Sequence, residues 1–133
     1  MWRSCYYFIN LNYKIMNTGI SDYLTRSLYT EWKPLMEEGV DTRGISVKVL
    51  RYDDQEKRAP TILLKFEAGA KYPYHNHPGG EEIFVLQGDA LIDGEILSEG
   101  DYLFTPKGFK HSVFSEKGCV LLFVIPEEVE ILE

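Results

Sequence analysis

The three histidines of this chain fall in two short segments, and their spacing suits a metal site. His75 and His77 are separated by one residue, and His111 lies further along the chain. Alternate residues of a β-strand project from the same face, so His75 and His77 can direct both imidazoles to one point. Pro78-Gly79-Gly80 predicts a sharp reversal directly after them. Imidazole nitrogens are common ligands of transition metals, so the pattern indicates metal binding.

Two acidic residues follow the reversal and compete for the role of an oxygen ligand. Glu81 is favoured because alternation places it on the inward face with Ile83 and Val85, whereas Glu82 points outward or supports the site from behind. With the three histidines, Glu81 completes a four-ligand set without thiolate. Such a set suits Fe(II), Mn(II), Ni(II), Cu(II) or Zn(II), and the sequence does not choose among them. One or two coordination positions stay open for water or a chelating ligand.

Two tyrosines on the predicted strand of His75 are further candidates for the site. Tyr72 and Tyr74 carry hydroxyl groups that can orient an oxygen atom of a ligand, and with Glu81 they are the candidate catalytic residues. Core packing is the simpler role for the other aromatic side chains on strands around the site, which are Phe66, Phe104, Phe109 and Phe123. No Ser-His-Asp or Cys-His arrangement is expected, because metal binding takes up every histidine.

From Ile45 onward, short apolar segments are separated by turn residues at about 8–12-residue intervals, which is typical of a sandwich or barrel. Asp93-Gly94 is a strong signal for a two-residue hairpin turn. Residues 127–133 are either an acidic tail or an edge strand. The expected all-β fold is a double-sheet jelly roll. Its strands are predicted at residues 45–52, 61–67, 72–77, 82–87, 90–92, 95–97, 101–105, 109–114 and 119–125.

The segment ahead of the barrel is expected to form an N-terminal arm. Residues 1–40 are assigned to this arm and residues 41–133 to a single barrel domain. Residues 1 to about 17 are expected to be disordered, with Met16 as an alternative start of the natural chain. Ser21–Tyr29 predicts a short helix capped by Ser21, with Leu24 and Leu28 on one face. The apolar segment at 32–36 is expected to pack against the outside of the barrel, and a partner-binding arm is the alternative.

Composition limits the partners and the compartment. The chain has 133 residues and a net charge of −7, enough for one domain and without a basic stripe for nucleic-acid phosphates. Cys5 and Cys119 are far apart and in no metal or redox spacing, which predicts free thiols in the cytoplasm. No apolar run reaches transmembrane length, and the first residues contain no signal-peptide cleavage site, so neither membrane insertion nor secretion is expected.

In its two histidine-bearing segments, Gly69–Gly88 and Gly100–His111, the chain resembles the cupin superfamily. The first cupin motif, G(X)5HXH(X)3,4E(X)6G, is matched in full by Gly69, His75, His77, Glu81 and Gly88. The second motif, G(X)5PXG(X)2H(X)3N, is matched by Gly100, Pro106, Gly108 and His111. Its last position is the exception, because Ser115 stands in place of asparagine. The match runs from about residue 45 to residue 125. It implies the cupin double-stranded β-helix, with metal ligands His75, His77, Glu81 and His111. In related cupins that use three histidines alone, a residue such as Glu81 would instead be a nearby base.

Within the superfamily, the segment HNHPGGEEIFVLQG, the Pro-x-Gly before His111 and Gly118-Cys119 are similar to the ChrR-type group. That group includes sensor domains of anti-sigma factors and oxygenase-like proteins related to diketone dioxygenases. The resemblance implies a metal-dependent oxygenase that acts on a chelating carbonyl compound of the diketone or hydroxyketone type. A non-catalytic ligand sensor and a redox-neutral isomerase or lyase are the alternatives. A direct anti-sigma role is disfavoured because the arm has no histidine and no paired cysteines. The implied partners are a small-molecule ligand and a second copy of the chain in a homodimer.

Overall fold

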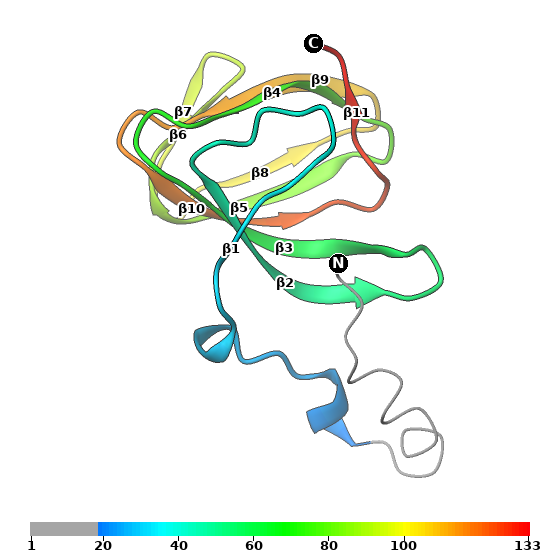
Figure 1. The fold of residues 1–133 in the computed structure, drawn as a ribbon. Coiled ribbons are helices and arrows are strands. Elements are labelled where there is room, and N and C mark those ends of the chain that lie inside the picture. The colour runs from blue at the N-terminus through cyan, green and yellow to red at the C-terminus, as the bar shows by residue number, and fades with distance from the viewer. Residues whose placement is uncertain (1–18) are drawn as a thin grey trace.

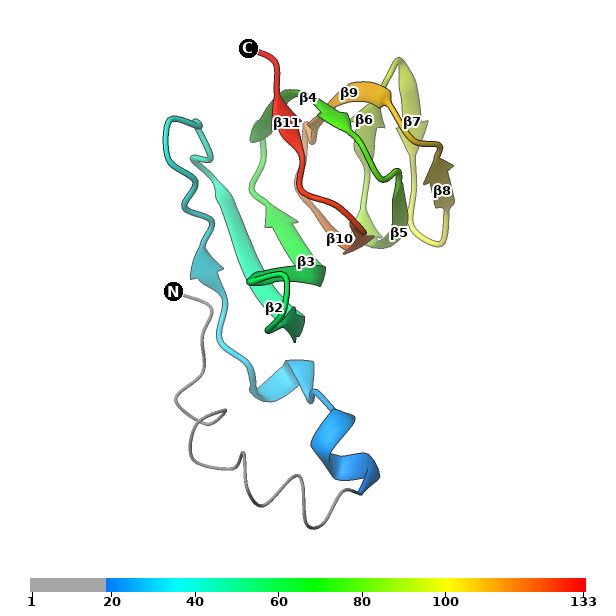
Figure 2. The ribbon, with the colours of Figure 1, turned by 90° about the vertical axis from the view of Figure 1, so that its right-hand side faces the viewer.

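Alternation of inward apolar and outward side chains from Ile45 onward produces two antiparallel sheets that face each other (Figures 1 and 2). The computed structural model describes residues 19–133. The expectations for residues 1 to about 17, including Met16 and Cys5, lie outside this range. The all-β double-sheet fold predicted from the sequence is confirmed, and every strand predicted from residue 45 onward is present with ends shifted by at most a few residues.

The larger sheet has six strands and the smaller sheet five. The order of the first is β1-β2-β3-β10-β5-β8 and that of the second is β11-β4-β9-β6-β7. The strands of the larger sheet are β1 Lys33–Pro34, β2 Ile45–Asp53, β3 Arg58–Phe66, β10 Cys119–Val124, β5 Glu81–Gly88 and β8 Tyr102–Thr105. The strands of the smaller sheet are β11 Glu130–Ile131, β4 Lys71–His77, β9 Phe109–Phe114, β6 Ala90–Ile92 and β7 Glu95–Leu97.

The core lies between the inner faces of the sheets and is built in cross-strand layers. Leu121 of β10 pairs with Leu64 of β3 on one side and with Val85 of β5 on the other, and all three side chains are buried. Burying one such side chain stabilises the fold by about 1.5–3 kcal/mol. Cys119, also buried, is a free thiol. The central strands are therefore a rigid scaffold for polar residues on neighbouring strands.

The hairpin between β6 and β7 turns at Asp93-Gly94, as predicted. Both residues have positive φ, 49° and 81°, which is the backbone that a tight two-residue turn requires. Residues 127–133, for which a tail and an edge strand were both open, include the short strand β11. This strand pairs with β4 and covers the edge of the smaller sheet.

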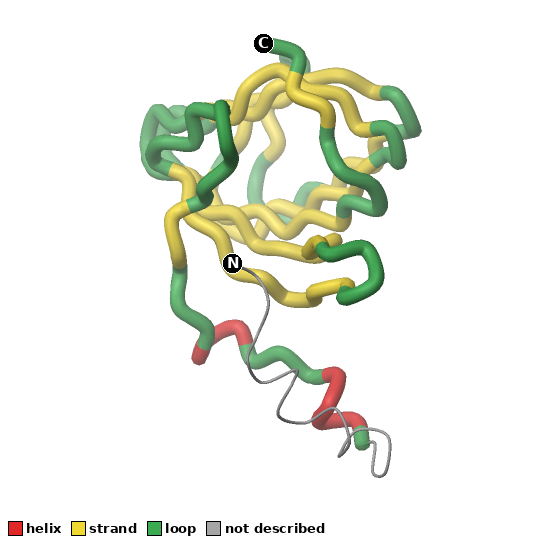
Figure 3. The backbone as a smooth tube through the Cα atoms, turned by 45° about the vertical axis from the view of Figure 1, so that its right-hand side comes forward, coloured by secondary structure: helices red, strands yellow, loops and turns green. Residues whose placement is uncertain are grey.

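The prediction of a single helix over Ser21–Tyr29 is wrong. The segment forms two short 3-10 turns, at Ile20–Tyr23 and Ser27–Tyr29, both in the arm (Figure 3). Leu28, expected on an apolar helix face, is 90% exposed. A helix this short needs tertiary burial to be stable, and here no face is buried.

The arm contacts the barrel, but the segment at 32–36 does not pack on the outside as predicted, because Lys33–Pro34 pairs with β2 as strand β1 of the larger sheet. Thr25 donates a hydrogen bond from its hydroxyl to Leu50 O, and the Trp32 ring lies under the ammonium groups of Lys48 and Lys65. Leu35 enters the hydrophobic core. Among residues 19–133, no helix has the length and hydropathy of a transmembrane span, and the cytoplasmic location stays a prediction.

Candidate metal centre

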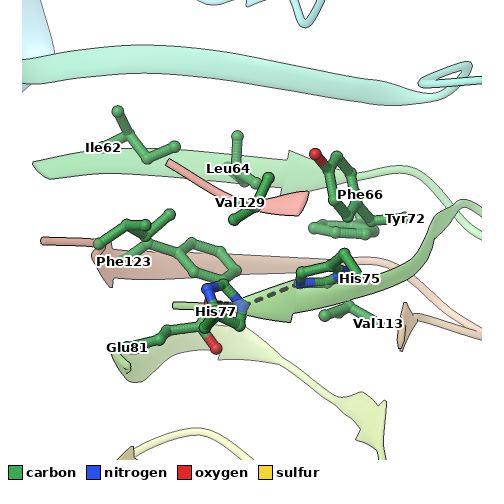
Figure 4. Close-up of a pocket in the computed structure, with 11 residues that line it drawn as sticks. Ile62, Leu64, Phe66, Tyr72, His75, His77, Glu81, Val113, Phe123 and Val129 are labelled. Carbon is green, nitrogen blue, oxygen red and sulfur yellow. Dashed lines mark hydrogen bonds and ion pairs between the residues drawn. The ribbon is translucent and has the colours of Figure 1, made fainter. Parts of the chain in front are cut away.

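Three strands bring the three histidines and one glutamate together inside the barrel (Figure 4). His75 and His77 lie on β4, and His111 is the direct cross-strand neighbour of His75 on β9. Glu81 is the first residue of β5. Each of the four side chains is at most 2% exposed. The structure therefore brings together all four residues that the sequence singled out as metal ligands.

The turn before Glu81 depends on glycine. Gly80 has a φ of 76°, and a Cβ atom on it would lie 2.7 Å from Thr105 O. The Gly80 N–H donates to His77 O at 3.1 Å, and the Gly108 N–H donates to the same carbonyl at 2.8 Å. Any side chain at position 80 would strain the backbone and collide with β8. This turn thus returns Glu81 to the histidines because glycine permits both the conformation and the close approach.

The polar atoms of the four residues converge on one point. His75 Nε2 and His77 Nε2 are 2.8 Å apart, and His77 Nε2 lies 2.9 Å from Glu81 Oε2. His111 Nε2 lies 3.1 Å from Glu81 Oε1. The four ligand atoms are all within 4.8 Å of one another. Neighbouring ligands around an octahedral ion with bonds near 2.1 Å are separated by about 3.0 Å, so this spacing suits one cation at the centre.

Hydrogen bonding in the cluster also suits a cation. His75 Nδ1 lies 2.6 Å from Pro73 O, and in the tautomer that donates this bond the Nε2 lone pair points inward. His77 Nδ1, His111 Nδ1 and Nε2, and Glu81 Oε1 are buried without a hydrogen-bond partner. Of these atoms, His111 Nε2 and Glu81 Oε1 face the cluster, and a cation bound between them would satisfy both, as buried polar atoms of native proteins normally are. Imidazole and carboxylate donors without thiolate match divalent transition metals.

The electrostatics keep His75 and Glu81 in their metal-binding forms. Burial lowers the pKa of His75 to about 4, so this imidazole is neutral at physiological pH. Burial alone would raise the pKa of Glu81, but the polar contacts of its carboxylate with the His111 and His77 rings outweigh burial, and the pKa is lowered. Glu81 is therefore a carboxylate. Deprotonated ligands are what metal binding requires.

Of the other candidate residues, Glu82 and Tyr74 lie outside the site and Tyr72 faces inward. Glu82 lies on the outer face and accepts a hydrogen bond of 2.6 Å from the Tyr102 hydroxyl. Tyr74 is 42% exposed on the outer face of β4, so it does not reach the site. Tyr72 faces inward because a bulge between Tyr72 and His75 shifts the alternation. Ser115, at the asparagine position of the second motif, donates to Asp89 O and accepts from Gly118 N, a structural role away from the cluster.

Glu37 joins the site from the arm, and sequence reasoning missed it. Both of its carboxylate oxygens accept hydrogen bonds from the Tyr72 hydroxyl, at 2.8 and 3.0 Å. Burial, the charge of Glu37 and this hydrogen bonding raise the pKa of Tyr72. The Tyr72 ring in turn meets the His75 ring edge-on, with centroids 4.9 Å apart. No motif marks Glu37, because it lies in the loop between β1 and β2 and its partner Tyr72 is 35 residues further along the chain, on β4.

A small cavity of about 70 Å³ adjoins the cluster. Its walls are apolar apart from the Tyr72 side chain and the cluster residues. Of the aromatics expected near the site, Phe66 and Phe123 line it, whereas Phe104 is 61% exposed on the outer face. The lining residues are Ile62, Leu64, Phe66, Tyr72, His75, His77, Glu81, Val113, Phe123, Ile125 and Val129. The cavity is a small, mainly apolar space beside the cluster, of the kind that holds a small ligand by few polar groups.

A two-sheet β-barrel with this buried cluster defines the class of the protein as a cupin with a candidate metal centre. Residues 21–128 match the family described as the ChrR cupin-like domain, and the chain belongs to that family. The chain is 42% identical over 55 residues to the dimethylsulfoniopropionate lyase DddQ of Ruegeria pomeroyi, a match that covers 38% of this chain and 27% of the lyase. The chain spans less than two thirds of the length of the curated relatives compared with it.

Solved structures share the fold at low identity. An acetylacetone dioxygenase from Acinetobacter johnsonii superposes with a TM-score of 0.66 at 19% identity, covering 77% of this chain and 72% of the dioxygenase. An RmlC-like cupin from Ralstonia eutropha superposes with a TM-score of 0.71 at 19% identity, covering 91% of this chain and 76% of the other. These similarities establish the cupin fold.

Proposed function

We propose that this protein is a metal-dependent oxygenase that acts on a small chelating carbonyl compound, such as a β-diketone or hydroxyketone. The observation that carries the proposal is the buried three-histidine, one-carboxylate cluster at the wall of a small apolar cavity. Such a cavity suits a ligand with two oxygen atoms at one end and short alkyl groups at the other. The fold shared with an acetylacetone dioxygenase supports the same substrate class.

The residues of the chain would divide the work. His75, His77, Glu81 and His111 would hold the metal, which when bound supplies Lewis acidity and, if redox-active, electrons for the reaction with O₂. The apolar walls, including Phe66 and Phe123, exclude water from the ligand. Glu37 holds the Tyr72 hydroxyl in one orientation, and Tyr72 packs on the ligand imidazole of His75.

A redox-neutral lyase is the second candidate. Sequence reasoning found no base for such a reaction besides Glu81 or Glu82. The hydrogen bond between Tyr72 and Glu37 supplies one, because the Glu37 carboxylate is placed to take the Tyr72 proton as the phenolic oxygen accepts a proton from a ligand. The partial match to a dimethylsulfoniopropionate lyase supports this alternative.

One experiment separates these functions from a ligand sensor. The protein is loaded with Fe(II) and O₂ uptake is recorded with a panel of β-diketones and hydroxyketones, with the His77→Ala variant as the control. Uptake that depends on substrate and is lost in the variant supports the oxygenase. Product formation without O₂ consumption supports the lyase. Binding of a carbonyl ligand without turnover in any metal form would overturn both and favour the sensor.

A further inference from the structure

The segment of the last eight residues contributes one residue to the lining of the cavity. After β10, residues Pro126–Glu133, here called the C-terminal strap, pass from the larger sheet to the edge of the smaller one (Figures 1 and 2). There Ile131 pairs with His75, and the Leu132 N–H donates to Tyr74 O at 2.9 Å. The strap is thus hydrogen-bonded to the strand that carries two of the cluster histidines.

Val129 is the residue of the strap that lines the cavity. Figure 4 shows it between the β3 side chains Ile62 and Leu64 and the histidines of β4. Nine of the eleven lining residues lie within strands, and Ile125 directly follows β10, where its N–H donates to Pro60 O at 2.7 Å. Val129 is therefore the lining residue that is set apart from the rigid sheets.

Besides its pairing with β4 and the packing of Ile131 against the core, the strap is attached by polar contacts at the surface. Arg58 donates to Pro126 O at 3.1 Å, and Asn76 donates from its side-chain amide to Glu130 Oε1 at 2.6 Å. Glu133 accepts from the Tyr74 N–H at 2.7 Å. Exposed contacts of this kind are individually weak and leave a segment able to adjust. We therefore expect the strap to accommodate a change of side-chain size at position 129 without loss of the barrel.

We infer that Val129 is a specificity-determining residue that limits how long a ligand the cavity accepts. The inference rests on the proposed function for the identity of the ligand, a straight-chain 1,3-diketone. The diketone oxygens lie at the cluster, and an alkyl arm extends along the apolar walls to Val129. In so small a cavity, the two methyl groups of Val129 take up space that a longer alkyl arm would need.

The test compares Val129→Ala and Val129→Phe with the wild type, using acetylacetone, heptane-3,5-dione and nonane-4,6-dione as probes. Affinity is read from the absorption of the Co(II)-loaded protein, and O₂ uptake is read with Fe(II). Val124→Ala is the matched control, because Val124 follows the cavity residue Phe123 on β10 and projects from the opposite face of the strand. Val129→Ala is expected to raise the affinity for nonane-4,6-dione relative to acetylacetone about tenfold. Val129→Phe is expected to lower this ratio, with folding checked by circular dichroism.

Three results distinguish this inference from the proposed function. A ratio that is unchanged in Val129→Ala, or that changes equally in Val124→Ala, overturns the inference even if diketones are oxidised. A ratio that follows the size of residue 129 without any O₂ uptake upholds the inference and removes the oxygenase. If no diketone binds to any metal-loaded variant, both are wrong.

Discussion

Replacing Glu81 by glutamine removes the one charged ligand of the proposed site while preserving its shape. Glu81 lies 2.9 Å from His77 Nε2 and 3.1 Å from His111 Nε2, inside the spacing of a single coordination sphere. Structural zinc sites with four ligands bind with about 10–16 kcal/mol, or about 2.5–4 kcal/mol for each ligand. Loss of one ligand is therefore expected to weaken metal affinity about 100- to 1000-fold. The assay is a competition titration of Zn(II) or Co(II) against a chromophoric chelator.

The neighbouring residue provides the control. Glu82 differs from Glu81 by one position, carries the same charge, and lies on the outer face beside Tyr102. Glu82→Gln is expected to leave metal affinity unchanged within about twofold, because a surface charge outside the coordination sphere contributes little. Equal weakening by both substitutions would show that only net charge matters, and weakening by Glu82→Gln alone would refute the assignment of the ligand.

Three further predictions address the surroundings of the site and the assembly. Tyr72→Phe removes the hydrogen bond to the Glu37 carboxylate and is expected to lower the free energy of unfolding by about 1–2 kcal/mol in urea titrations. Metal affinity is expected to stay unchanged, because neither Tyr72 nor Glu37 is a metal ligand. A loss of metal affinity would contradict this. In the metal-free protein, the free energy of unfolding is expected to fall by about 3 kcal/mol as the pH drops from 6.5 to 4. The reason is that His75 takes up a proton over this window in the unfolded state, whereas its pKa in the folded state is about 4. Denaturant titrations at several pH values measure the effect, and a flat profile would show that His75 is not desolvated. A homodimer is expected in light scattering. Phe104→Glu, on the exposed outer face of β8, is expected to shift it toward monomer, and Ile96→Glu, on β7 of the other sheet, is the control that leaves the dimer intact. A monomeric wild type would contradict the prediction.

The cluster could be predicted from the sequence because its geometry is local. His75 and His77 share a strand face, and Gly80 permits the return of Glu81, so short spacing alone determines their convergence. His111 was placed through a second motif, and the register of β4 with β9 confirms it as the neighbour of His75. The strands were found for the same reason, since their period-two pattern and turn glycines are readable over a few residues.

The features that the sequence did not reveal depend on irregular or long-range structure. Alternation from His75 and His77 places Tyr74 outside, as observed, but a bulge in β4 turns Tyr72 inward, and strict alternation cannot anticipate such a shift. Glu37 and Val129 reach the site from the arm and from the strap, segments with no motif of their own. The arm forms 3-10 turns where the spacing of Leu24 and Leu28 suggested a helix, because leucines four apart indicate a helix only when something covers them.

The central claim is that four side chains from three strands hold one divalent transition-metal ion. X-ray absorption spectroscopy of the protein loaded with one equivalent of Co(II) tests it most directly. We expect a single metal per chain with nitrogen and oxygen ligands near 2.1 Å, imidazole scattering from three histidines, and loss of one imidazole in His111→Ala. A spectrum that shows a fully hydrated ion, or one unchanged in that variant, would contradict the claim.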